Sequence, residues 1–106
     1  MDKVKKQRLE KKGWKVGRVD EFLGLTPEEA AYIEMKLALA DSIKERRLRR
    51  KLTQIDLARM LKSSQSRVAK IERGDASVSI DLLMRSLIVL GATRRDLAQV
   101  IGYRHP

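Results

Sequence analysis

Apolar positions recur at helical spacing from residue 27 onward, and capping residues and glycines separate the segments that carry them. A long pattern starts at Thr26 and Pro27, a threonine cap followed by a proline in the first turn, and continues without a stop until Lys51. Shorter patterns cover residues 54–62, 65–73, 80–90 and 94–101. The sequence therefore predicts an all-α fold of five helices.

The second and third of these helices form a closely joined pair at 53–73. Thr53 and Asp56 predict a capping box, because each side chain can bond to the backbone amide of the other residue. Ser63 and Ser64 end the first helix and cap the second, which begins near Gln65 and stops at Gly74. The spacing predicts one buried face shared by the pair, made of Leu57, Ala58, Leu61, Val68 and Ile71.

The outward face of the second helix of the pair is polar and basic. It carries Gln65, Ser66, Arg67, Ala69, Lys70 and Arg73. In the major groove, Gln can pair bidentately with adenine and Arg with guanine. The solvated face of any helix in a basic protein is also polar. A capped helix pair with a tight turn and a glutamine at each N-terminus favours recognition of DNA over that alternative.

Charge strengthens the case for a polyanionic partner. The 106 residues hold 24 Lys and Arg against 14 Asp and Glu, a formal net charge of +10. Such a chain is attracted to polyanions, and its affinity falls as salt rises. Charge alone would suit RNA or an acidic membrane equally well. The helix pair is the feature that favours duplex DNA.

The segment from about Leu39 to Ile101 resembles the XRE family of helix-turn-helix domains, which share the fold of the phage repressors and Cro. The family's Thr-Gln-x-x-Leu-Ala opening and Ile-Glu-x-Gly close are matched by Thr53, Gln54, Leu57, Ala58, Ile71, Glu72 and Gly74. The resemblance implies a phage repressor-like five-helix domain. Here the first helix is extended at its N-terminus and follows a short basic arm.

The same resemblance implies roles for individual residues. Gln54 would bind a phosphate, and Arg47 on the preceding helix would form a structural ion pair with Glu72. Lys62 stands where many relatives have glycine, so either the turn is less tight or the lysine is strained. Lys62 is also a candidate phosphate contact. The predicted DNA-binding set is Gln54, Lys62, Ser64, Gln65, Ser66, Arg67, Lys70 and Arg73.

The fourth helix is too apolar to bury only one face. Seven of the nine residues at 82–90 are apolar: Leu82, Leu83, Met84, Leu87, Ile88, Val89 and Leu90. Either two of its faces are buried within the monomer, or one is a subunit contact. Because phage repressors dimerise near this end of the domain, the resemblance favours a homodimer. Two recognition helices about 34 Å apart would then require a palindromic operator.

The chain divides into a basic arm and lead segment at 1–25, the helix-turn-helix domain at 26–102 and a tail at 103–106. The arm, rich in lysine up to Lys15, is either solvated or bound to phosphates. The N-terminal half of the long helix is apolar on too many sides to be solvated. Either the segment 16–25 or another chain should cover it.

Several functional classes are excluded by the residues that the chain lacks. It has no cysteine and a single histidine, His105, and no nucleophile stands at a recognisable spacing from a base. No cation loop, phosphate-binding glycine loop or membrane-length apolar run is present. We therefore expect a cytoplasmic binding protein with no catalytic residues, no metal and no cofactor.

Taken over residues 16–101, the chain resembles the HigA-type antitoxins. Such proteins bind a small ribonuclease toxin of the RelE or HigB type and repress their own operon as dimers. The resemblance implies that a toxin would be held by residues before about 40. The alternatives are a stand-alone repressor, a restriction-modification controller, or an XRE adaptor that binds RNA or the ribosome.

Overall fold

The computed structural model describes residues 26–102, so the predictions for the arm at 1–25 and the tail at 103–106 lie outside the described residues. This range contains five helices and no strand. They are α3 (Pro27–Arg49), α4 (Gln54–Met60), α5 (Gln65–Arg73), α6 (Ile80–Val89) and α7 (Arg94–Gly102). The predicted all-α fold with a long first helix is confirmed.

Hydroxyl caps explain where the helices begin. In each helix the cap hydroxyl accepts a hydrogen bond from the backbone amide three residues later, at 3.0 to 3.2 Å. The caps are Thr26, Thr53, Ser64, Ser79 and Thr93. Complete capping boxes form in α4 and α7, where the cap amide donates to an aspartate at 2.8 Å. In α3 the Glu29 carboxylate instead accepts from the Thr26 hydroxyl at 3.3 Å, so only half of a capping box forms there.

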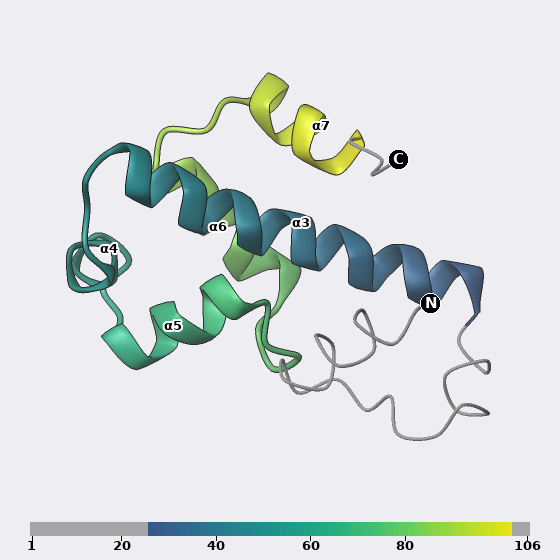
Figure 1. Cartoon of the computed structure of the whole chain (residues 1–106), viewed down its shortest axis with the longest axis horizontal. Coiled ribbons are helices and arrows are strands. Elements are labelled where there is room, and N and C mark those ends of the chain that lie inside the picture. Colours follow the sequence, from purple (N-terminus) through teal and green to yellow (C-terminus); the bar gives the residue numbers. More distant parts are fainter. Residues whose placement is uncertain (1–25, 103–106) are drawn as a thin grey trace.

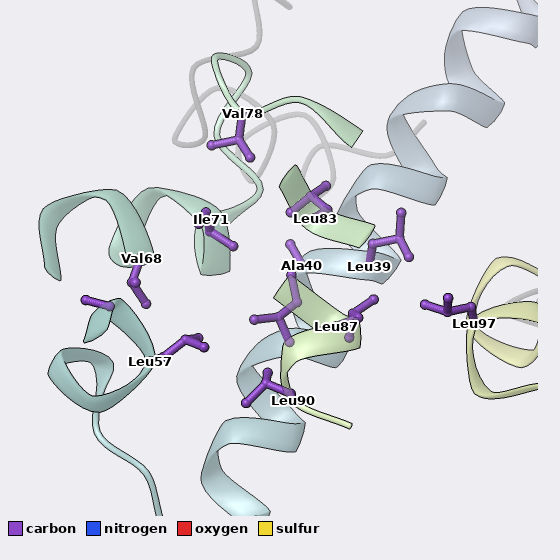
Figure 2. Close-up of a cluster of buried hydrophobic side chains, with 12 residues drawn as sticks. Leu39, Ala40, Leu57, Val68, Ile71, Val78, Leu83, Leu87, Leu90 and Leu97 are labelled. Atoms are coloured by element: carbon purple, nitrogen blue, oxygen red, sulfur yellow. The ribbon is translucent and has the colours of Figure 1, made fainter. Parts of the chain in front are cut away.

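The long helix α3 is the centre of the arrangement. It packs against α5, α6 and α7, and α4 packs against α5. Figure 1 shows α7 on one side of α3 and the α4–α5 pair on the other. Figure 2 shows side chains from all five helices meeting in one core. That core consists of Leu39, Ala40, Ile43, Leu57, Ala58, Val68, Ile71, Val78, Leu83, Leu87, Leu90 and Leu97.

The N-terminal half of α3 is buried at three positions. Ile33 and Leu37 are each 6% exposed, and Lys36 between them is 2% exposed. Leu37 lies directly against Gly74, where an added Cβ would come within 2.9 Å of its Cδ2. Burial lowers the pKa of Lys36, and the charge of Asp75 partly opposes that shift. A buried lysine at this position was not predicted, because a lysine on an amphipathic helix usually marks its solvated face.

The apolar residues of α6 are divided between two environments. Leu83, Leu87 and the capping residue Leu90 lie in the core, and Leu82 and Met84 pack partly against it. Ile88 and Val89 remain exposed at 57% and 38% of their surface. The monomer therefore buries one face of α6 and leaves apolar side chains at the end of another.

Candidate nucleic-acid interface

The α4–α5 pair is held together by the apolar face that the sequence predicts. Leu57, Val68 and Ile71 are fully buried, and the methyl group of Ala58 is 4% exposed. A side chain larger than this methyl would hold the two helix axes apart. Leu61 is only half-buried and packs against the edge of the core. This packing fixes the orientation of α5 relative to the rest of the domain.

The turn between α4 and α5 is tight, and a lysine forms it. Lys62 has a φ of 54°, in the left-handed region that glycine favours. The amide of Ser63 donates to the Ala58 carbonyl at 2.8 Å and closes α4. Of the two alternatives for this turn, the strained lysine is the one that the structure adopts.

The outward face of α5 presents four polar side chains without burying any of them. Gln65, Ser66, Arg67 and Lys70 are all exposed. Ser64, immediately before them, uses its hydroxyl to accept from the Arg67 amide at 3.2 Å, so part of its hydrogen-bonding capacity serves the cap. The first two turns of α5 therefore offer an amide, a hydroxyl, a guanidinium and an ammonium group to a partner.

Arg73 differs from the other predicted contacts because it has an acidic neighbour. Its Nη2 lies 3.4 Å from Oδ2 of Asp75. Asp75 also accepts from the amide and the hydroxyl of Ser77, at 3.0 and 2.7 Å. The Ser77 amide is the main reason that the pKa of Asp75 is lowered, with smaller contributions from the Ser77 hydroxyl and Arg73. The structure thus directs Arg73 toward the α5–α6 connection rather than toward the start of α5.

A buried ion pair joins α3 to the end of α5. Arg47 donates from Nε to Glu72 Oε2 at 2.6 Å and from Nη2 to Oε1 at 3.1 Å, while its Nη1 donates to the Leu52 carbonyl at 2.8 Å. The two charged side chains are 9% and 3% exposed. This bidentate pair ties the base of α5 to the long helix.

Gln54 joins the same network. Its Nε2 donates to Glu72 Oε1 at 3.3 Å, which holds the first side chain of α4 over the end of α5. The amide oxygen and the second N–H are left to a further partner. The structure therefore brings Gln54, Arg47 and Glu72 together.

The comparison with protein-family models returns a helix-turn-helix family over residues 43–97. The match spans the C-terminal part of α3 and all of α4, α5 and α6. The chain belongs to this XRE-type helix-turn-helix family. Its members are DNA-binding transcriptional regulators and not enzymes, which confirms the prediction of a binding function. No curated protein and no solved structure matched the chain.

Two further findings concern residues 26–102 of this helix-turn-helix protein. None of the helices in that range is long and apolar enough to cross a membrane. The same range contains no group of three or more His, Cys, Asp or Glu side chains placed to hold a metal ion.

The sequence did not signal the structural roles of two lysines outside the predicted contact set. Lys36 is buried next to the α5–α6 connection, and Lys51 adopts a left-handed backbone at the end of α3, with a φ of 57°. The only signal for Lys51 was its position directly after the long helix and two residues before the Thr53 cap, where a helix-ending glycine is common.

Proposed function

We propose that this helix-turn-helix protein binds a specific duplex DNA operator through α5 and represses transcription there. The observation that carries the proposal is the exposed polar face at the start of α5, on a helix whose buried face is fixed by the core. Gln65 and Arg67 would read base edges, and Ser66 would contact a base or the neighbouring backbone. Lys70, Lys62 and Gln54 would contact phosphates, which position the protein without carrying sequence information.

Selection from a pool of random duplexes with the full chain tests this proposal. The recovered sequences should share a motif, and Gln65→Ala should relax the preference at one position of that motif. Arg85→Ala is the matched control, because Arg85 is exposed on α6, outside the predicted contact set. If the recovered pool had no motif, sequence-specific recognition would be ruled out.

We infer that the protein acts as a homodimer through the exposed end of α6. Ile88 and Val89 are large apolar side chains at 57% and 38% exposure, next to a helix face that is already in the core. A two-fold pairing there would bury both side chains and would require an operator with two-fold symmetry. Light scattering should give twice the monomer mass, and Ile88→Glu should give a monomer.

Leu48→Glu is the control for that substitution. Leu48 is exposed to nearly the same extent, 55%, but lies near the end of α3. Leu48→Glu should therefore leave the mass of the dimer unchanged. A wild-type chain that is monomeric both free and on DNA would contradict the dimer.

We also propose that the operator belongs to the protein's own operon and that the protein is the antitoxin of a toxin-antitoxin pair. Supporting this, α3 extends well before the family match begins at residue 43, and its added part exposes Tyr32 at 43%. This part of α3 is the surface on which a RelE- or HigB-like toxin would be held. The sequence resemblance to the HigA-type antitoxins, which spans residues 16–101, supports the same assignment.

Co-expression with the product of the adjacent gene tests the antitoxin role. The two proteins should co-purify, the neighbour alone should arrest growth, and Tyr32→Ala should weaken the complex. If the adjacent gene encoded no toxin, the remaining candidate functions would be a stand-alone repressor and a restriction-modification controller. Retention of ribosomal RNA in preference to the protein's own promoter would favour the RNA adaptor instead.

A further inference from the structure

Four of the five helices in residues 26–102 end in the same type of turn. In each, one residue has a positive φ and the next residue's amide donates to the carbonyl five positions back, at 2.8 to 3.1 Å. The positive-φ residues are Lys51 after α3, Lys62 after α4, Gly74 after α5 and Gly91 after α6. Their φ values are 57°, 54°, 66° and 91°. Two of these turns therefore use the residue suited to the geometry, and two use a lysine that is strained by it.

Packing explains the choice of residue at only one of the four turns. A Cβ at Gly74 would come within 2.9 Å of Leu37, so a side chain is excluded there. At Gly91 nothing lies within 4 Å of an added Cβ, so space would admit a side chain. The distribution of lysine and glycine therefore does not follow from space alone.

The position of the two lysine turns in the chain sets them apart. They are the turns that lead into α4 and into α5, whereas the glycine turns lead into α6 and α7. The spacing to the next cap does not distinguish them, because Lys51, Lys62 and Gly91 each stand two residues before a cap. In Figure 1 the chain passes from the end of α3 through α4 to α5, so the two lysines flank α4. Both side chains are exposed, and neither takes part in an ion pair with the residues that the structure describes.

We propose that Lys51 and Lys62 are a matched pair of contacts to the phosphodiester backbone of duplex DNA, one on each side of α4. The inference rests on the proposed function, and it adds Lys51, which neither the family match nor the motif assigns. Backbone strain that persists where glycine would relieve it is typical of functional positions. Here each strained lysine puts a positive charge at the turn before α4 or before α5. Each of these charges would displace a counterion from DNA.

The test compares Lys51→Gly, Lys62→Gly and the double variant in the full chain, by melting temperature and by affinity for a random-sequence duplex at several salt concentrations. Each glycine should raise the melting temperature by a few degrees, because it removes left-handed strain. Each should also reduce the slope of log K against log salt by about 0.9, which is about 3.5-fold in affinity over a fourfold change in salt. The double variant should show both effects summed.

Three controls separate charge from strain. Lys51→Arg keeps the charge and the strain, so it should leave the melting temperature and the slope of log K against log salt unchanged. Arg95→Gln removes a charge from α7, on the opposite side of α3 from α5 in Figure 1, and should leave the slope unchanged. Gly91→Lys should lower the melting temperature by at least as much as Lys51→Gly raises it, because the φ of 91° at Gly91 lies further from the left-handed well than the 57° at Lys51 and the added side chain meets no neighbour.

The inference is overturned if Lys51→Gly is more stable and keeps the wild-type salt slope, because the lysine would then be merely tolerated. It is also overturned if Arg95→Gln lowers the slope as much as Lys51→Gly, because the effect would then be one of net charge. A wild-type chain with no salt-dependent affinity for any duplex would instead refute the proposed function itself, so the two failures are distinguishable.

Discussion

Removal of the Glu72 carboxylate should strongly destabilise this protein, because it breaks a buried ion pair. Glu72 is the buried partner of Arg47, and it also accepts from Gln54. In Glu72→Ala the guanidinium would stay buried with one remaining acceptor, the Leu52 carbonyl at 2.8 Å. The loss in free energy of unfolding therefore measures the cost of burying the Arg47 charge without its partner.

The magnitude follows from that geometry. Leaving one charge of a buried pair without its partner costs about 3 to 5 kcal/mol. At about 0.05 to 0.15 kcal/mol per residue, residues 26–102 have a total stability of about 4 to 12 kcal/mol. A loss of about 3 kcal/mol lowers the melting temperature of a domain of this size by about 12 °C or more. Glu72→Ala should thus lose about a quarter or more of the total stability.

Urea and thermal denaturation followed by circular dichroism measure this loss. Glu45→Ala is the matched control: its carboxylate pairs with Arg49 at 3.6 Å, but both side chains are about two-thirds exposed. That control should change the free energy of unfolding by less than about 0.5 kcal/mol. Replacing both buried partners, as in Arg47→Met with Glu72→Leu, should restore most of the stability. A Glu72→Ala variant as stable as Glu45→Ala would refute the reasoning.

Three further outcomes follow from the structure. Thr53→Ala removes the cap of α4 and should lower the free energy of unfolding by about 1 kcal/mol in urea titrations, whereas Thr53→Ser should be nearly neutral. Gly74→Ala should destabilise by at least about 1 kcal/mol, because its φ is 66° and its Cβ would meet Leu37; equal stability would show that α3 and α5 can move apart. The hydrogen bonds from Ser77 hold the pKa of Asp75 below its ordinary value, so their contribution is complete at neutral pH and is lost as pH falls through the folded-state pKa. Asp75→Asn should therefore flatten the loss of unfolding free energy as pH falls below about 4, and an unchanged pH dependence in acid would contradict that assignment.

Local signals predicted the helices because each one is encoded within a few residues. The Thr53 and Asp56 box, the Ser64 cap and the glycine at 74 fix starts and ends through hydrogen bonds that span five residues or fewer. The apolar spacing then decided which face of each helix is buried. The positions of α4 and α5 were therefore within reach of the sequence alone.

Three features of the structure were less accessible from the sequence. The burial of Lys36 depends on what lies beside the N-terminal half of α3, and lysine on a helix carries no signal for burial. The partnership of Arg73 with Asp75 depends on the shape of the α5–α6 connection, which the Ser77 hydrogen bonds determine. The strain at Lys51 could not be predicted, because glycine is the usual sequence signal for a left-handed backbone and lysine is not.

The interface itself was predictable in outline. Exposure of Gln65, Ser66, Arg67 and Lys70 follows from the helical period once the buried face is known. Their exposure does not reveal which base each would contact, because that depends on how α5 sits in the groove. The sequence likewise does not reveal what Gln54 would contact on DNA, and its side chain already donates a hydrogen bond to Glu72.

The central claim is that α5 reads a specific duplex. It is tested most directly by a band-shift titration of the full chain against the DNA upstream of its own gene, at about 150 mM salt with an excess of random competitor. A discrete complex should survive the competitor, and Gln65→Ala or Arg67→Ala should weaken it by about 5-fold to 150-fold, corresponding to about 1 to 3 kcal/mol. A complex that random DNA displaces equally well, or that is indifferent to both substitutions, would contradict it.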